Sequence, residues 1–391
     1  MTTSKKIHVV TKYFYPVAAG IETNILETYS VLVRKGWDVT LHTSKDEYLT
    51  KNSLPDTEVI RGIKVVRYPF KSELLGFWPK INWQEKSVVC LHNFNTFFWQ
   101  ILLYSLWLKL TGRKKFGLVL TPHGGFNPEW SIFNPVTALL KQIYHYTIGT
   151  FLINTVVDKV RAVSEWERTE IIKRGVKQNK IVTISNGLED EAYANIDKLA
   201  SPEIKLKVKK LGKYLIQIGR IYQIKNYETV IKALPLIPKD IKFVIVGQSE
   251  KNLDYKNGLT KQAEDLGIGD RLVFLGVVRG IDKYYVIKHA QMMVHMAIWE
   301  SFCNVVHEGM SQGLICIVAN AYALPFLVKE GITGFLVNTF DYQTLADKIN
   351  YILKNLKSSK IINMKKNSRE FGLQDSWQNV AGRMDKLYSN I

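Results

Sequence analysis

Two glutamates, Glu300 and Glu308, stand where a strand is expected to give way to a helix. The apolar run 292–298 predicts a buried strand. The residues after it predict a helix that ends near Gln312, because Gly313 supplies a stop signal. Glu300 would then lie in the loop at the carboxyl end of the strand, and Glu308 about two turns into the helix. Carboxylates in these positions can accept hydrogen bonds from vicinal sugar hydroxyls.

The start of the same helix offers a second kind of group. The first backbone N–H groups of a helix have no partner inside it, so a helix N-terminus can bind an anion. Here these N–H groups belong to Cys303, Asn304 and Val305. One loop could therefore hold a sugar, a diphosphate and a ribose. Considered alone, the glutamate pair is more simply interpreted as two solvated surface acids.

A basic pair follows another expected strand. The run 214–218 predicts a buried strand, and Gly219, Arg220, Lys225 and Asn226 come directly after it. Arginine offers a forked pair of donors and lysine a point charge, and both suit a phosphate group. The alternative is a pair of ordinary surface cations, since the chain is rich in both residue types.

Three further positions lie at the ends of expected strands. His123 follows the strand 117–121 in a loop with a proline and two glycines, where open α/β sheets bind ligands. Gly20 ends a loop of small residues before a helix, and Gly247 ends a strand; glycine lets a ligand approach the backbone closely. A lone histidine is more often structural, but the loop favours a site role for His123. The other histidines lack ligand-like spacing and are expected in the core or on the surface: His8, His42, His92, His145, His289, His295 and His307.

Length and composition limit the kind of protein. The 391 residues are 46% hydrophobic and carry a formal net charge of +18, so the chain can form two domains and should meet anionic partners. Three cysteines without metal-like spacing indicate a reducing compartment and no zinc site. Residues 1–6 do not read as a signal peptide, and no apolar run reaches the roughly 18–20 residues needed to span a bilayer. No RNA-binding signature is visible, and no nucleic-acid partner is expected.

Strand and helix patterns alternate along the chain, which indicates an α/β architecture. We expect a first domain over residues 1–195, a second over residues 196–372, and a final helical segment over residues 373–391. The polar stretch 189–210 is interpreted as the linker between the domains.

The glutamate motif resembles that of the family 4 retaining glycosyltransferases, whose usual form is E-x-F-G-x-x-x-x-E-A-M-A-x-G-x-P. Five positions match it: Glu300, Phe302, Glu308, Met310 and Gly313. Cys303 stands where the family usually has glycine, and Gly309 where it usually has alanine. The basic pair also matches, since the family carries G-R-x4-K followed by glycine or asparagine. Two loops depart from the family pattern, at Ala19 and at Tyr322, Ala323 and Phe326.

The resemblance implies a GT-B fold, with two Rossmann-like domains facing across a cleft and a C-terminal helix crossing back to the first domain. It implies retaining transfer of a sugar from a nucleoside diphosphate donor, based on UDP or GDP, to an acceptor hydroxyl. The acceptor would be a sugar or a lipid-linked glycan, in the synthesis of a cell-surface polysaccharide or glycolipid. Similar enzymes use no metal and no cofactor, and this chain has no Asp-x-Asp motif of the kind that binds a metal ion.

The resemblance also implies residue roles. The first glutamate of the motif would contact the donor sugar and the second the ribose, while the cations meet the leaving diphosphate. The residues expected at the reacting centre are His123, Arg220, Lys225 and Glu300. The residues expected to bind the donor are Gly20, Gly219, Asn226, Gly247, Phe302, Cys303, Asn304, Val305 and Glu308.

Other classes of protein remain possible from the sequence. Sugar-nucleotide epimerases and phosphorylases also use two facing Rossmann-like domains, although the epimerases lack the glutamate loop in this form. A membrane- or nucleotide-sugar-binding protein without catalysis would also suit the high positive charge.

One apolar stretch bears on the location of the protein. Helical steps place five large side chains near one face: Trp99, Leu103, Leu106, Trp107 and Leu110. Lys109 and the basic run 113–115 lie at or beyond its end. The pattern predicts a helix lying on an anionic membrane surface, at the cytoplasmic face of the plasma membrane. The alternative is that this stretch and the second apolar stretch, 136–153, are buried helices packed on the sheet.

Overall fold

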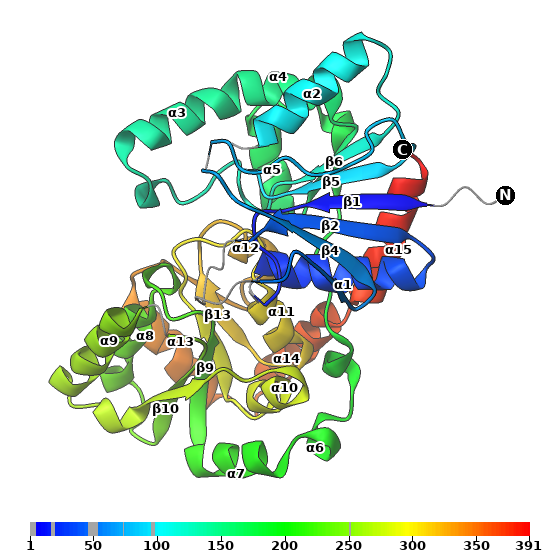
Figure 1. The fold of residues 1–391 in the computed structure, drawn as a ribbon. Helices are drawn as coiled ribbons and strands as arrows, with labels where there is room; N and C mark the ends of the chain where they lie inside the picture. Colours follow the sequence, from blue (N-terminus) through cyan, green and yellow to red (C-terminus); the bar gives the residue numbers. More distant parts are fainter. Residues whose placement is uncertain (1–4, 17–19, 46–53, 73, 95–97, 250–251) are drawn as a thin grey trace. The chain divides into compact units, whose positions relative to one another are not determined.

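The computed structural model describes residues 5–16, 20–45, 54–72, 74–94, 98–249 and 252–391. The chain divides into two compact units (Figure 1). Unit 1 comprises Met1–Gly187 together with Trp377–Ile391, and unit 2 comprises Leu188–Ser376. Each unit is built around a twisted sheet with helices on its faces, which confirms the predicted α/β class.

The strands of unit 1 lie side by side in the order β3-β4-β2-β1-β5-β6-β7-β8. The neighbours pair in parallel, except that β3 runs antiparallel to β4. The central strands β5 and β6 are buried along their whole length, as expected for parallel strands covered on both faces. The strand bounds are β1 Lys6–Val10, β2 Asp38–Ser44, β3 Thr57–Ile60, β4 Ile63–Tyr68, β5 Val88–His92, β6 Gly117–Thr121, β7 Lys159–Ala162 and β8 Ile181–Thr183.

Helices cover both faces of this sheet. One hydrophobic core packs α1 and α15 against the sheet, and the other packs α2 and α4 against it. The last helix, α15, lies along α1 in unit 1 as predicted, with Tyr388 stacked near Tyr29. The helix bounds are α1 Gly20–Arg34, α2 Trp99–Leu110, α3 Pro135–Tyr146, α4 Ile148–Val156, α5 Glu165–Lys173 and α15 Trp377–Ser389.

Unit 2 has a parallel sheet in the order β11-β10-β9-β12-β13-β14. The strands are β9 Lys213–Ile218, β10 Ile241–Val246, β11 Leu272–Gly276, β12 Met292–His295, β13 Cys316–Ala319 and β14 Gly334–Val337. The helices are α6 Ile196–Leu199, α7 Pro202–Leu211, α8 Tyr227–Ala233, α9 Leu253–Asp265, α10 Gly280–Lys288, α11 Asn304–Ser311, α12 Leu324–Leu327, α13 Tyr342–Lys354 and α14 Ser359–Gly372. Strand β9 lies between β10 and β12, so segments distant in sequence meet at its carboxyl end.

The units divide at residues other than those expected from the sequence. The first division falls after Gly187 rather than after residue 195, and the last segment begins at Trp377 rather than at 373. Residues 188–195 belong to unit 2 because Glu189 forms an ion pair with Lys283, 2.8 Å apart. The stretch 189–210 is not an extended linker, since it forms α6 and α7, and Ser201 caps α7.

One other expectation differs from the structure, and it concerns the end of a strand in unit 2. Strand β12 ends at His295 rather than continuing to residue 298, because the backbone N–H of Ile298 donates to Ile224 O, at 2.8 Å, outside the sheet. Within the described residues, no helix is both long enough and apolar enough to cross a membrane.

Candidate active site

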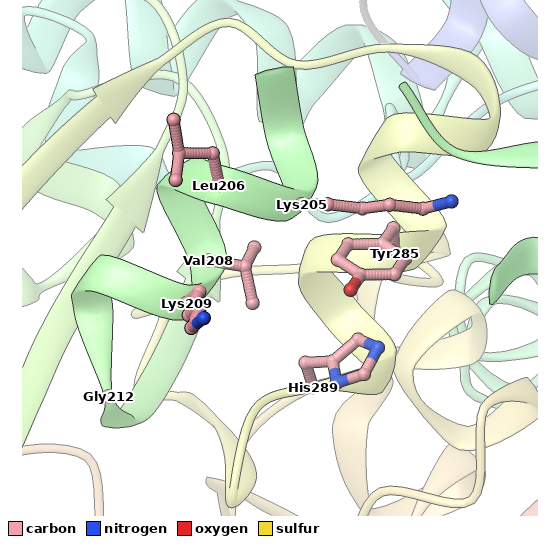
Figure 2. Close-up of a pocket in the computed structure, with 7 residues that line it drawn as sticks. All are labelled: Lys205, Leu206, Val208, Lys209, Gly212, Tyr285 and His289. Carbon is pink, nitrogen blue, oxygen red and sulfur yellow. The ribbon is translucent and has the colours of Figure 1, made fainter. Parts of the chain in front are cut away.

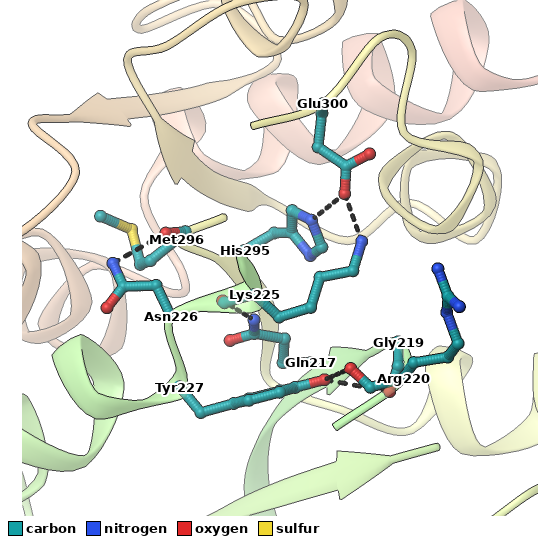
Figure 3. A network of polar contacts seen from close by, with 9 residues as sticks. All are labelled: Gln217, Gly219, Arg220, Lys225, Asn226, Tyr227, His295, Met296 and Glu300. Atoms are coloured by element: carbon teal, nitrogen blue, oxygen red, sulfur yellow. Dashed lines mark hydrogen bonds and ion pairs between the residues drawn. The ribbon is translucent and has the colours of Figure 1, made fainter. Parts of the chain in front are cut away.

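Glu300 stands at the centre of a polar network at the carboxyl end of β12 (Figure 3). Its Oε1 accepts a hydrogen bond from Lys225 Nζ at 2.5 Å and another from His295 Nε2 at 2.9 Å. Lys225 ends the short 3-10 helix Gln223–Lys225 that follows β9, while His295 is the last residue of β12. The neighbouring positions of β9 and β12 therefore bring the two expected motifs together.

The charges of this network reinforce one another. Burial would raise the pKa of Glu300, but the charge of Lys225 and the hydrogen bond from His295 outweigh it and lower that pKa to about 2. Burial would lower the pKa of Lys225, yet the charge of Glu300 keeps it above its usual range. Burial lowers the pKa of His295, so its imidazole is neutral and its Nε2–H donates. Glu300 and Lys225 are consequently an ion pair at neutral pH.

Only one oxygen of the Glu300 carboxylate is used by these contacts. Both donors meet Oε1, and among the described residues no hydrogen bond reaches Oε2. A carboxylate oxygen has two lone pairs, so Oε2 can accept hydrogen bonds from a ligand's hydroxyl groups. The lysine and histidine fix the carboxylate while leaving this oxygen available.

The loop around Arg220 is shaped by two glycines. A Cβ on Gly247 would lie 1.8 Å from Gly219 O, so only glycine allows the ends of β9 and β10 to approach this closely. Tyr227 Oη donates to Gly219 O at 3.0 Å and holds the loop from below. The exposed Arg220 extends its guanidinium toward the end of Lys225, whose pKa its positive charge acts to lower (Figure 3). This side of the loop therefore gathers two cations.

Asn226 has a structural position in the same loop. It takes the left-handed conformation, with φ +50°, at the start of α8. Its Nδ2 donates to Met296 O at 2.9 Å and to Thr339 O at 2.7 Å, and its side chain is buried. The expected donor-binding role of Asn226 stays a prediction, but these bonds show that it holds the loop against the neighbouring strand ends.

Helix α11 starts where the sequence predicted it. Its first residue is Asn304, and Cys303 before it makes no side-chain cap, so the first-turn N–H groups, including that of Val305, are not capped by that residue. Cys303 has φ +82°, a left-handed conformation that costs roughly 1–2 kcal/mol for a residue with a Cβ. The backbone thus explains why glycine is usual in the related motif. Phe302 is buried, with its ring edge-on to His307.

Glu308 lies in a second ion-pair cluster. Lys283 Nζ on α10 is 3.1 Å from Glu308 Oε1 and 2.8 Å from Glu189 Oε2. Glu308 Oε2 is buried and has no hydrogen-bond partner. Burial is the main influence that raises the pKa of Glu308, while Lys283 acts in the opposite direction. A buried carboxylate oxygen without a partner needs an explanation, and a bound hydroxyl group would supply one.

The two candidates in the first half belong to unit 1. His123 is nearly buried after β6 and has φ +52°. The next residue, Gly124, donates its N–H to Glu167, whose other oxygen accepts from Val163 N at 2.7 Å. Gly20 is exposed at the start of α1, and the departure at Ala19 lies outside the described residues.

Sequence reasoning missed several residues of these clusters. His295 was expected in the core or on the surface without a role in the site, yet it contacts Glu300 directly. Lys283 and Glu189 were not singled out at all, and no spacing in the sequence links them to Glu308. Tyr322 has φ +51° and its ring lies 6.4 Å from that of Trp299, so the departing loop borders the glutamate motif.

A pocket of about 570 Å³ lies elsewhere in unit 2, between α7 and α10 (Figure 2). It contains none of the residues predicted for the site. Its lining includes Lys205, Lys209, Tyr285 and His289. His289 Nε2 is 3.2 Å from Asp197, so it already has a protein partner. The candidate site is therefore defined by the carboxyl ends of β9 and β12 and not by this pocket.

The fold is that of the GT-B glycosyltransferases, and comparison with known families agrees. The model of glycosyl transferases group 1 matches residues 202–371, and the model named Glycosyltransferase Family 4 matches residues 18–192. The two models together match most of the chain, one in each half.

Individual relatives are more distant. The D-inositol 3-phosphate glycosyltransferase of Mycobacterium tuberculosis is 25% identical over 243 residues, which cover 62% of this chain and 50% of the relative. The chain thus spans about half the length of the curated relatives it matches. Among solved structures, Anabaena HepE in complex with UDP and glucose is 19% identical with a TM-score of 0.74, covering 99% of this chain and 100% of that one. Sucrose-phosphate synthase from Thermosynechococcus elongatus is also 19% identical with a TM-score of 0.74, covering 99% and 98%.

Proposed function

We propose that this protein transfers a sugar from a nucleoside diphosphate sugar to an acceptor hydroxyl with retention of configuration. The observation that carries the proposal is the pair of available carboxylate oxygens. Glu300 Oε2 is left open beside a fixed Oε1, and Glu308 Oε2 is buried without a partner. Both can accept from hydroxyl groups, which a sugar and a ribose supply.

The cations complete the proposed reaction. As the bond between the sugar and the diphosphate breaks, negative charge develops on the leaving phosphate. Lys225 and Arg220 lie on one side of the β9 loop, where they can stabilise that charge, and the N-terminus of α11 adds backbone N–H groups. Glu300 orients the donor sugar, and the leaving phosphate accepts the proton of the acceptor hydroxyl on the same face. Because the HepE complexes contain UDP, UDP and its sugars are the first nucleotides to test.

A nucleotide-sugar screen tests this function. The purified protein would be heated with UDP, GDP, UDP-glucose, UDP-N-acetylglucosamine and GDP-mannose at equal concentrations. A ligand at 100 times its Kd adds about 2.7 kcal/mol to the free energy of unfolding, so the correct donor should raise Tm clearly. Release of free nucleotide from that sugar nucleotide would then show turnover. Epimerised sugar nucleotide as the product, or donor binding without any product, would favour the competing classes of protein.

Removal of metal ions is expected to leave transfer intact. The ammonium group of Lys225 already neutralises Glu300, so the leaving phosphate meets protein cations rather than a metal ion. The ring nitrogen, carboxylate and thiol of His295, Glu300 and Cys303 lie within 4.8 Å of one another and are potential metal ligands, which makes the test informative. Initial rates would be compared with and without excess EDTA. Complete loss of activity that a divalent ion restores would contradict the expectation.

We also propose that unit 1 binds an anionic membrane surface at the cytoplasmic face of the plasma membrane. Helix α2 buries Ile101, Leu102 and Leu108 against the sheet, but Leu103, Trp107 and Leu110 are exposed on its other side. The neighbouring helices α3 and α4 also expose large apolar side chains, so the alternative that both apolar stretches are fully buried is wrong for these faces. The exposed side chains are Val136, Leu139, Leu140, Ile143, Ile148 and Phe151. An exposed apolar surface of this kind is typical of an interaction site.

The basic residues near this surface do not all remain available. Lys114 Nζ is 2.7 Å from Asp158 Oδ2, and Lys109 Nζ donates to Thr155 O at 2.6 Å. Arg113 lies 5.9 Å from the ring centre of exposed Trp107. Arg113 and Lys115 are therefore the residues best placed to meet lipid phosphates.

Changing Arg113 and Lys115 to glutamate is expected to release the protein from vesicles that contain phosphatidylglycerol. Each basic residue near an anionic surface contributes about 1 kcal/mol, and added salt should weaken the binding further. The measurement is co-sedimentation with anionic and with neutral vesicles. The same charge change at Lys205 and Lys209 on α7 is the matched control and should leave binding unchanged. Equal sedimentation with neutral vesicles, or none with either kind, would reject the proposal.

A further inference from the structure

A continuous chain of buried hydrogen bonds runs through unit 1 to His123. Tyr388 Oη on α15 lies 2.8 Å from Tyr29 Oη on α1, and Tyr29 Oη lies 2.8 Å from His92 Nε2 at the end of β5. His92 Nδ1 then lies 3.0 Å from His123 Nε2. Tyr29 and His92 are fully buried, whereas His123 keeps 8% of its surface exposed. The chain therefore connects the interior of unit 1 to a loop at the carboxyl end of β6.

The protons of this chain can be arranged in two ways. Burial is the main influence that lowers the pKa of both His92 and His123, so each ring is neutral and carries one N–H. In one arrangement Tyr29 donates to His92, and His92 donates to His123. In the reverse arrangement His123 donates to His92, and His92 donates to Tyr29. Because neutral His92 has one proton, no mixture of the two satisfies both of its nitrogens.

The first arrangement is chemically preferred. A phenol O–H is a stronger acid than the N–H of a neutral imidazole, and an imidazole nitrogen is a better acceptor than a phenol oxygen. Tyr29 should therefore donate to His92, while its own oxygen accepts from Tyr388. His92 then carries its proton on Nδ1 and donates it to His123 Nε2. His123 is left with its proton on Nδ1, and no described residue bonds to that atom.

We propose that Tyr29 and His92 are positioning residues that hold His123 as the Nδ1–H tautomer, so that it presents a hydrogen-bond donor to a sugar oxygen of the donor substrate. The inference rests on the proposed function, since it assumes that His123 contacts the sugar. The tautomer of a histidine is set by the bond that its other nitrogen makes. The hydrogen bonds from α1 and β5 thereby fix both the orientation and the hydrogen-bonding sense of His123.

A second chain in the same unit supplies a matched control. Tyr68 Oη lies 2.9 Å from His42 Nδ1, and His42 Nε2 lies 3.1 Å from His8 Nδ1. Like the first chain, it links a tyrosine hydroxyl group to two histidines in series, although it has no second tyrosine, and His42 and Tyr68 are buried. It does not include His123. Tyr29→Phe and Tyr68→Phe thus remove the same buried hydroxyl group from two similar chains, of which only one leads to the predicted site.

The kinetic test is a double-mutant cycle with the sugar nucleotide that gives the fastest turnover in the screen. Tyr29→Phe should lower kcat about 10-fold, because the tautomer is no longer fixed, while KM for the donor changes less than about twofold. In the His123→Ala background the same change should cost less than about twofold, since the positioned ring is gone. Tyr68→Phe should leave kcat unchanged. An equal loss with and without His123, or an equal loss for both tyrosines, would show a merely structural role and overturn the proposal.

The tautomer itself can be read without turnover. In protein labelled with ¹⁵N at its eight histidines, ring-nitrogen shifts separate protonated from unprotonated nitrogens, and the His123 signals are those that disappear in His123→Ala. Wild-type protein should show His123 protonated on Nδ1, and Tyr29→Phe should shift its signals toward the other tautomer. A wild-type His123 protonated on Nε2, or signals unchanged by Tyr29→Phe, would overturn the proposal even if transfer is confirmed. If the tautomer is as expected but no sugar nucleotide binds, the proposed function fails instead.

Discussion

Replacing Lys225 with methionine is expected to lower kcat about 10²- to 10³-fold, the range found when one preorganised group that stabilises developing negative charge is removed. The ammonium group serves the network in two ways. It stands beside the position proposed for the leaving phosphate, and it forms the 2.5 Å ion pair that fixes Glu300 Oε1. Methionine fills similar space without the charge, so the loop conformation around β9 should persist.

The same variant should change the pH dependence of the reaction. In the wild type, Lys225 and His295 lower the pKa of Glu300 to about 2, so the carboxylate is ionised throughout the usual assay range. Without Lys225, burial dominates and the pKa of Glu300 rises. The acidic limb of the kcat profile should therefore move to higher pH in Lys225→Met. The measurement is kcat against pH for both proteins, with the donor at saturating concentration.

The ion pair has a matching effect on stability. Because the pKa of Glu300 in the folded protein is below its usual value of 4.5, the pair contributes stability that is fully present above pH 4.5 and is lost as pH falls toward about 2. Lys225→Met should remove this contribution. Lys348→Met is a suitable control, because Lys348 pairs with Glu330 at a more exposed position, 3.0 Å apart. Wild-type kcat in Lys225→Met, or an unchanged acidic limb, would contradict the proposed centre of the site.

The motif residues could be predicted from sequence because local spacing places them at the ends of strands. Glu300 and Lys225 each follow an expected strand, and the resemblance assigns them to one site. Their direct contact depends on something further, which is that β9 lies next to β12 in the sheet. Strand order is set by tertiary packing and is not encoded in the spacing of either motif. His295 was missed for a different reason. It precedes Glu300 closely in the sequence, but their contact depends on how the loop between them folds back onto the end of β12.

Two other features needed the structure for different physical reasons. Glu308, Lys283 and Glu189 come from three separate segments of the chain. No local spacing in the sequence therefore predicts that they form one cluster. The exposed faces of α2 and α4 could not be told from buried ones, because an apolar helix has the same periodicity whether sheet, partner or lipid covers it. The left-handed conformation of Cys303 was not predicted either. The glycine usual at this position of the related motif indicates it, because glycine adopts a positive φ readily.

Glu308→Ala is expected to weaken the binding of UDP about 10- to 150-fold, which corresponds to the roughly 1.5–3 kcal/mol of a hydrogen bond to a charged group. The reason is the buried Oε2, which has no protein partner and is proposed to accept from ribose hydroxyls. Turnover at saturating donor should change much less, because Glu308 does not meet the reacting sugar. The measurement is Kd by isothermal titration calorimetry, together with kcat.

Glu308→Ala separates an effect on binding from an effect on folding, because Lys283 keeps an ion-pair partner. Its Nζ remains 2.8 Å from Glu189 Oε2 when Glu308 is removed, so the change leaves no buried ammonium group unpaired. Lys283→Met would instead leave two carboxylates together and confuse folding with binding. A ligand lacking one hydroxyl makes the test specific to the ribose. Wild-type protein should bind UDP more tightly than 2′-deoxy-UDP, and Glu308→Ala should lose much of that preference. Equal preference in the two proteins would show that Glu308 does not contact the ribose.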